Sequence, residues 1–301
     1  MTETLSTMLE GVIDYAGLFP PAQLEMRKAL EDYARGVEKY DWLVDRMVVT
    51  AARIGEAAAA AESLRYASTE EPIYACVVAS PITSGSAAGE VIDRDLAFMD
   101  SQNILIPSTY EIRLPEDGLV QAAKALNRRM HRFEPSGVEV FVEVGWGENL
   151  VENIHGVSGE IEEFGLKART GGITADAFPS IPELASFISE AVSLEQLVKF
   201  TAGLHEPLRY LDVDLNCHRH GFLNAIFAFY GAISLDLNHA EIENILAVED
   251  PSKVSFTDET AKLGDYELTL EAIEVGRDWF GGFGSCSYEE PISGLKRLKL
   301  L

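Results

Sequence analysis

Short apolar runs alternate along the chain with longer segments in which apolar residues recur every three or four positions. The short runs predict strands at residues 12–18, 46–52, 73–80, 103–107, 138–145, 166–170, 197–202 and 283–287. The longer segments predict helices at residues 22–40, 55–67, 88–101, 116–133, 148–164 and 181–191. Ser180 and Glu183 match a capping box at the start of the last of these helices. Repeated strand–helix units of this kind are typical of a closed (β/α)8 barrel, which is the fold class we predict.

The connection between the seventh and eighth predicted strands is much longer than a single crossover. Residues from about 204 to 280 contain several helix-like stretches, which predict a helical insertion at the end of the barrel where active sites form. No low-complexity linker divides the chain, so residues 1–301 are expected to form a single barrel domain. An open doubly wound sheet is the competing architecture.

Composition narrows the range of partners. The chain is acidic, with a formal net charge of −25, which argues against nucleic acids and anionic membranes. Its three cysteines are far apart in the sequence, which is typical of a reducing compartment. The amino-terminal residues lack a signal pattern, and no apolar stretch is long enough to cross a bilayer. We therefore expect a cytoplasmic protein that binds a small-molecule substrate, and the sequence leaves a homo-oligomer open.

Two lysines are the strongest indication of function. Lys167 and Lys199 lie in consecutive predicted strands, on the face opposite to apolar neighbours such as Leu166 and Val198. If the apolar face packs under helices, both lysines point into the barrel, where a lysine is costly unless it is paired or catalytic. Burial and a second positive charge would lower the pKa of one lysine and provide the neutral amine that forms a Schiff base. The alternative is a structural ion pair with Glu143 or Glu139.

Other polar groups fall at the ends of predicted strands. Glu143 shares a strand face with Glu139, where it could move protons or hold Lys199 charged. Asp14 and Tyr15 precede a Phe-Pro-Pro turn, and an aspartate there could bind a substrate hydroxyl or serve only the turn. The last strand contains a Gly-Phe-Gly-Ser-Cys-Ser segment, which weakly resembles an anion-binding nest.

Three histidines follow the seventh predicted strand. His205 comes directly after it, and His218 and His220 lie within the insertion near Asp212. Their spacing is not that of helical metal ligands, so a structural or substrate-contacting role is favoured over a metal site. His220 and Asn224 could share one face of a helix.

The order of these motifs resembles that of deoxyribose-phosphate aldolase, a class I aldolase family. The resemblance covers an Ile-Asp pair ending in Asp14, the glutamate of Val-Glu-Val-Gly at Glu143, the Lys-x-x-Thr-Gly segment of Lys167, the Lys-x-x-x-Gly segment of Lys199, and the final Gly-Ser-Cys-Ser. It implies a (β/α)8 barrel, a Schiff-base lysine at Lys167 and a phosphate-binding last strand. The chain departs from the family in the fourth strand, where residues 103–107 offer no acid for proton relay. The segments Asp-Tyr-Ala-Gly-Leu-Phe-Pro-Pro and Phe-Gly-Ser-Cys-Ser also resemble a group of uncharacterised bacterial proteins, which implies no function.

Together the residues and the resemblance predict a class I aldolase or lyase that acts on a small carbonyl compound, sugar or sugar phosphate without a cofactor or metal. Lys167, Lys199 and Glu143 are the predicted catalytic residues, and Arg169 would hold a carboxylate or phosphate. The predicted substrate-binding residues are Asp14, Tyr15, Arg169, Thr170, Thr201, His205, His220, Asn224, Gly284 and Ser285. The alternatives are a metal-dependent isomerase or hydrolase that uses the histidines, Asp212 or Glu143, and a barrel that binds small molecules without catalysis.

Overall fold

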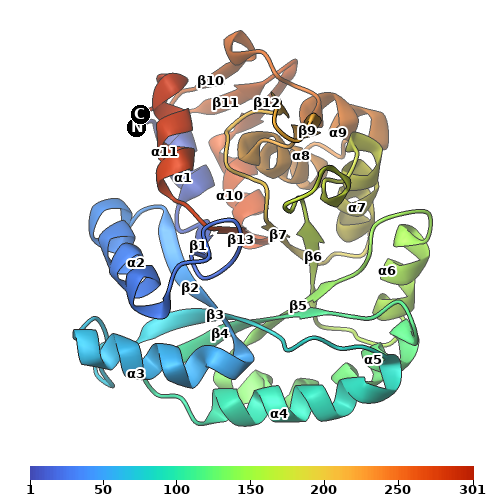
Figure 1. The fold of residues 1–301 in the computed structure, drawn as a ribbon. Helices are drawn as coiled ribbons and strands as arrows, with labels where there is room; N and C mark the ends of the chain where they lie inside the picture. Colours follow the sequence, from blue (N-terminus) through green and yellow to red (C-terminus); the bar gives the residue numbers. More distant parts are fainter. The chain divides into compact units, whose positions relative to one another are not determined.

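Eight strands form a closed barrel in the computed structural model, which describes residues 1–301 (Figure 1). They lie in the order β1-β13-β7-β6-β5-β4-β3-β2, and their described pairings are parallel. Their bounds are β1 Ile13–Tyr15, β2 Val44–Thr50, β3 Ile73–Val78, β4 Leu105–Arg113, β5 Glu139–Glu143, β6 Gly165–Arg169, β7 Leu197–Thr201 and β13 Phe280–Ser285. The predicted (β/α)8 class is confirmed.

The chain divides into two compact units. The first contains Met1–Ile13, Trp42–Val44 and Ala168–Leu301, and the second contains Asp14–Asp41 and Asp45–Lys167.

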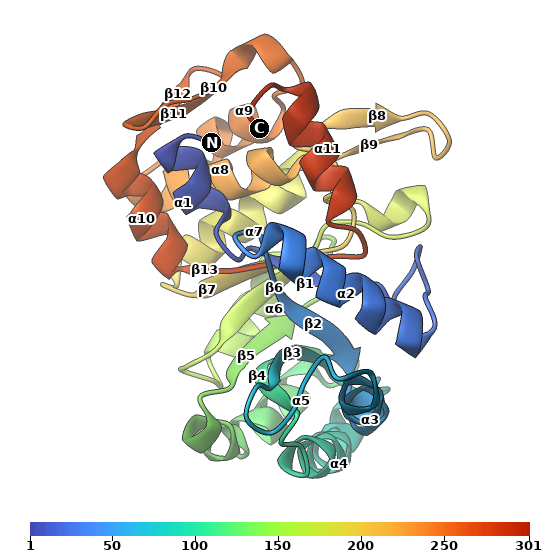
Figure 2. The same cartoon turned by 90° about the vertical axis from the view of Figure 1, so that its left-hand side faces the viewer.

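The second unit alternates strands with five helices. These are α2 Met26–Tyr40, α3 Ile54–Leu64, α4 Ala88–Asp100, α5 Leu119–Asn127 and α6 Leu150–Ser158. Figures 1 and 2 both place α3, α4 and α5 on one side of β3 and β4. Tyr110 of β4 faces this side, because its hydroxyl donates a hydrogen bond to Asp95 of α4 and its ring stacks on Phe133. Since side chains alternate along a strand, Glu111 points to the opposite face.

The extent predicted for the fourth strand was wrong. We expected it at residues 103–107, whereas β4 continues to Arg113. Its register against β3 shifts after Pro107, so that Ala75 pairs with Pro107 and Cys76 pairs with Thr109. The irregularity accommodates the proline, which cannot donate to a regular ladder. The continuation is what brings Glu111 into the barrel strand.

The first unit contains α1 Glu3–Leu9, the end of β6, strands β7 and β13, and the predicted insertion. A capping box at Ser180 and Glu183 opens α7 Ile181–Ser193, as the sequence predicts. Helices of the insertion are α8 Phe222–Ser234, α9 His239–Leu246 and α10 Leu270–Asp278, and α11 Glu289–Arg297 follows β13. The insertion also contains strands that were not predicted: the hairpin β8 Tyr210–Asp212 and β9 Cys217–Arg219, and the sheet of β10 Val254–Phe256, β11 Thr260–Leu263 and β12 Tyr266–Thr269. The short 3-10 helices are Ala51–Arg53, Gly85–Ala87, Met130–Arg132, Glu134–Ser136, Ala175–Ala177 and Pro251–Lys253.

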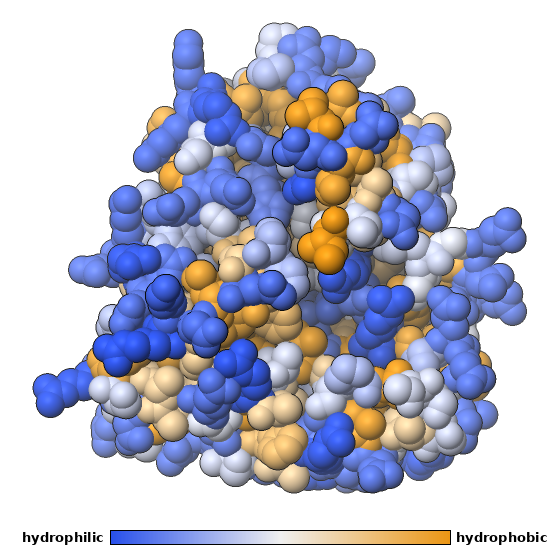
Figure 3. All heavy atoms as spheres, viewed as in Figure 1, coloured by the Kyte–Doolittle hydropathy of each residue, from blue (hydrophilic) through white to orange (hydrophobic).

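Charged and polar side chains dominate the face of the molecule drawn in Figure 3, and the hydrophobic ones gather only in small groups. This fits the acidic composition of the chain. No helix of the structure has both the length and the apolar content that a membrane crossing requires.

Candidate active site

One face of the strands in the second unit carries a row of ionisable side chains. Register places them there: Val48 pairs with Cys76, Cys76 pairs with Thr109, and Glu143 pairs with both Arg113 and Lys167. Residues paired in register point to the same side of a sheet, and so do residues two positions apart. The shared face therefore carries Arg46, Cys76, Glu111, Glu143 and Lys167.

Lys167 lies between two carboxylates. Its Nζ donates a hydrogen bond to Glu111 Oε2 at 2.8 Å and lies 2.9 Å from Glu143 Oε2. All three side chains are almost completely buried, with exposed fractions of 4–6%. Glu143 Oε1 has a further contact of 3.5 Å with the exposed Arg113. A buried charge requires such partners, and this lysine has two.

The pKa expected for Lys167 was wrong in direction. We expected burial and a second positive charge to lower it below the ordinary value of 10.5. Burial acts in that direction, but the charges of Glu111 and Glu143, together with the hydrogen bonds to them, outweigh it and raise the pKa. At neutral pH Lys167 is therefore an ammonium group, held by two carboxylates.

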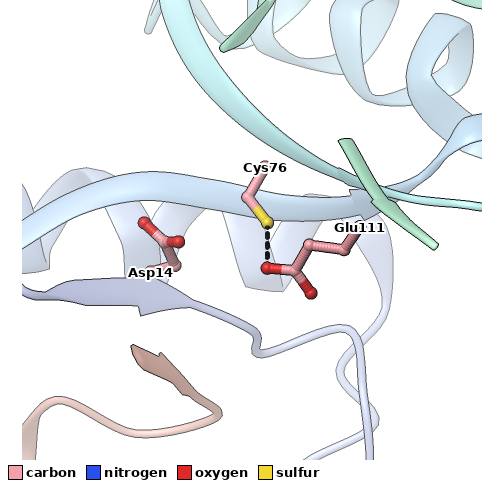
Figure 4. A group of neighbouring side chains, drawn as sticks. All are labelled: Asp14, Cys76 and Glu111. Atoms are coloured by element: carbon pink, nitrogen blue, oxygen red, sulfur yellow. Dashed lines mark hydrogen bonds between the residues drawn. The ribbon is translucent and has the colours of Figure 1, made fainter. Parts of the chain in front are cut away.

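Asp14 and Cys76 extend the cluster. Asp14 is buried and accepts a hydrogen bond of 2.8 Å from Arg46 Nε, whose pKa is raised by the neighbouring aspartates. Cys76 is also buried, and its Sγ donates to Glu111 Oε1 at 2.9 Å, the bond drawn in Figure 4. Tyr15, next to Asp14, donates from its hydroxyl to Asp32 at 2.5 Å. Asp14 thus balances the charge of Arg46 rather than only supporting a turn.

The ligand atoms of Asp14, Cys76 and Glu111 all lie within 4.8 Å of one another, which is close enough for a metal ion. Arg46 and Lys167 already balance the two carboxylates, however. The charges in the cluster therefore favour its present ion pairs over a metal centre.

Lys199 and two of the predicted threonines lie in the first unit. Lys199 of β7 is completely buried. Thr170 is buried just beyond β6, and its hydroxyl donates to the carbonyl groups of Thr201 and Ala202. Arg169 ends β6 with an exposed side chain. The hydroxyl of Thr170 therefore joins the ends of β6 and β7.

The end of β13 provides little that would favour a phosphate group. Ser285 donates its hydroxyl to the carbonyl of Ser287 at 2.6 Å. A side chain at Gly284 would meet the Thr201 hydroxyl at 2.8 Å, so a small residue is required there. The first turn of α11 carries Glu289 and Glu290, whose charges occupy the position where a helix favours an anion. A phosphate at this turn would meet two carboxylates.

His205 forms a pair with Glu290 in the same unit. Its Nδ1 lies 2.6 Å from Glu290 Oε2, and this contact lowers the pKa of the Glu290 carboxyl. Such a contact fixes the orientation of an imidazole ring.

His220 and Asn224 both form hydrogen bonds with main-chain groups. The His220 Nε2 lies 2.8 Å from the carbonyl oxygen of Pro179, and burial lowers its pKa to about 4. Both amide hydrogens of Asn224 are donated to carbonyl groups, those of Ile245 and Val248, and its oxygen accepts from the Arg209 amide. These contacts of Asn224 connect parts of the insertion.

The histidines do not gather into a metal site. His205, His218 and His220 have separate partners, and no group of metal-ligating side chains in the structure includes a histidine. Asp212 is paired with Arg219. The metal-dependent alternative therefore finds no ligand set among these residues.

Sequence reasoning missed Glu111, Arg46 and Cys76. A signal for Glu111 was present, because the alternation of side chains continues through Thr109, Glu111 and Arg113 beyond Pro107. The partners of Cys76 and Arg46 depend on register between strands distant in sequence, which no local pattern reveals.

We compared the chain with known protein families, curated proteins and solved structures. No family model matches the chain, and no curated protein matches it. Among solved structures, the chain is similar to the tetrameric deoxyribose phosphate aldolase from Aeropyrum pernix, with a TM-score of 0.41 and 11% sequence identity over 98% of each chain.

Proposed function

We propose that this protein is a class I aldolase or lyase that forms a Schiff base between Lys167 and a small carbonyl substrate. The observation that carries the proposal is the position of the Lys167 ammonium between Glu111 and Glu143, at 2.8 and 2.9 Å. The barrel alone says little about the reaction, so the argument rests on this group of three.

The charge of the site matches that of the intermediate. A protonated Schiff base carries one positive charge at the nitrogen, as the ammonium does. Two carboxylates that raise the pKa of Lys167 will also stabilise this iminium cation. Because the resting ammonium carries the same charge, the carboxylates stabilise the lysine and the iminium alike, and the charge between them is the same before and after the Schiff base forms. The same carboxylates keep the free amine scarce, so the site must remove a proton when the carbonyl arrives.

The neighbouring carboxylates supply that proton transfer. Glu111 Oε2 accepts a proton from Nζ, and the neutral amine then attacks the carbonyl carbon to give a carbinolamine. The protonated Glu111 returns the proton to the hydroxyl group, which leaves as water and produces the iminium. Glu143, which lies next to Arg113, can accept the proton released when the bond beside the iminium is cleaved.

The substrate class that we propose is a small aldehyde, ketone, keto acid or sugar. A phosphorylated sugar is less suited, because the predicted phosphate position before α11 is followed by Glu289 and Glu290. Eight further residues stay proposed site residues: Lys199, Asp14, Tyr15, Arg169, Thr170, Thr201, His205 and His220. Lys199 lies in the middle of β7, and His205 follows this strand.

Exchange of carbon-bound protons tests this proposal. An iminium acidifies the carbon next to it, so the protein should incorporate deuterium from D2O at that carbon of acetone, dihydroxyacetone or pyruvate. The measurement is NMR of the compound over time. Lys167→Arg keeps a positive charge between the carboxylates but cannot form the Schiff base, and we expect its exchange rate to fall at least about 1,000-fold, to the rate of buffer.

Lys124→Arg is the matched control, since Lys124 is half exposed and 3.5 Å from Glu160. Its exchange rate should equal that of the unmodified protein. Exchange that persists in a folded Lys167→Arg variant would contradict the proposal.

A further inference from the structure

Cys76 is the neighbour of Glu111 that the proposed reaction does not yet use. It lies in the middle of β3 and is completely buried, and its Sγ is 2.9 Å from Glu111 Oε1. Figure 4 shows the thiol pointing at the Glu111 carboxylate, with Asp14 beside this pair. A buried cysteine in an apolar core would be a small hydrophobic residue, but this thiol faces charged groups.

The two oxygens of Glu111 have different partners. Oε2 accepts from the Lys167 ammonium, and Oε1 accepts from the Cys76 thiol. Bonds to both oxygens fix the plane of the carboxylate, so that Oε2 stays directed at Nζ. The last torsion angle of glutamate is broad and shallow, so such bonds are what define the orientation of its carboxylate.

We infer that Cys76 is a positioning residue, which holds Glu111 as the proton acceptor of Lys167 through its thiol hydrogen bond. The inference rests on the proposed Schiff-base function. It assigns no covalent chemistry to the sulfur, and the thiol keeps its proton throughout. Cys76 acts on the proton balance of Glu111 and not on the substrate.

Two substitutions separate this role from simple packing. Cys76→Ala removes the donor, and Cys76→Ser keeps one in nearly the same place. The rate of borohydride-trapped adduct formation with dihydroxyacetone is measured against pH. Loss of the donor makes Glu111 easier to protonate. The pH below which the rate of adduct formation falls should therefore rise by about one unit in Cys76→Ala. Cys76→Ser should restore it to within a few tenths of a unit, and Cys217→Ala, at the free cysteine of β9, should leave it unchanged.

An infrared titration supplies a second measurement that needs no substrate. The carboxylic acid band that Glu111→Gln removes should appear at higher pH in Cys76→Ala than in the unmodified protein. A shifted infrared titration in a protein that traps no carbonyl compound would refute the Schiff-base function and uphold the position of Cys76. Trapping at Lys167 with no shift of either profile in Cys76→Ala would overturn the inference about Cys76 and leave the lysine chemistry intact.

Discussion

Replacing Lys167 by Met should reduce the free energy of unfolding at pH 7 by about 3–5 kcal/mol, because it leaves two buried carboxylates without their shared cation. Glu111 and Glu143 would then repel each other until one of them takes up a proton. The loss should therefore shrink as the pH is lowered from 7 to 5. Chemical denaturation at both pH values measures the change.

The matched control for this change is Lys124→Met. The Lys124 ammonium is half exposed and lies 3.5 Å from Glu160, a contact of the kind that contributes at most about 1 kcal/mol. If Lys167→Met costs no more than this control, the buried ion pairs are not the stabilising feature that the distances imply.

Acid should destabilise the protein through His220, and His220→Gln should remove that part of the loss. The pKa of His220 is about 4 in the folded chain and has its ordinary value of 6.5 in the unfolded chain. Between these values only the unfolded chain takes up the proton, so stability is full above pH 6.5 and declines as the pH falls to 4. The loss amounts to about 3 kcal/mol.

Glutamine is the appropriate replacement because its amide nitrogen can keep the hydrogen bond that His220 Nε2 makes with the carbonyl oxygen of Pro179. The difference in unfolding free energy between the variant and the unmodified protein, measured from pH 7 to pH 4, isolates this residue from the titrating carboxylates. His131→Gln, at an exposed position, should have no such effect. A constant difference over the whole range would show that the buried imidazole does not govern the acid response.

The barrel could be predicted because its strands repeat a local pattern. The residues that pair with its buried charged side chains could not be predicted in the same way. Lys167 was recognisable from its place among Leu166 and Ala168, which are both buried. Its ion pair with Glu143 was one of two alternatives, and its second partner was missed because Pro107 was taken as the end of the strand. Because Glu111 was missed, the attraction of the carboxylates for the Lys167 ammonium was underestimated relative to the effect of burial. The pKa of Lys167 was therefore expected to fall, whereas it is raised.

The insertion was predicted by its length and its helices, but not by its strands. The strands β8 to β12 have three or four residues each, too few for an alternating pattern to stand out. Asn224 illustrates a second limit. Its position on the first turn of α8 was visible, but its partners Ile245 and Val248 lie beyond the helix and are reached only through tertiary packing.

Borohydride trapping followed by mass mapping of peptides shows whether Lys167 forms a Schiff base. The protein is incubated with dihydroxyacetone, pyruvate and small aldehydes, reduced, digested and analysed for modified lysines. We expect a reduced adduct on the peptide that contains Lys167 and none in the Lys167→Arg variant. An adduct confined to Lys199, or the complete absence of an adduct on the folded protein with every carbonyl compound, would contradict it.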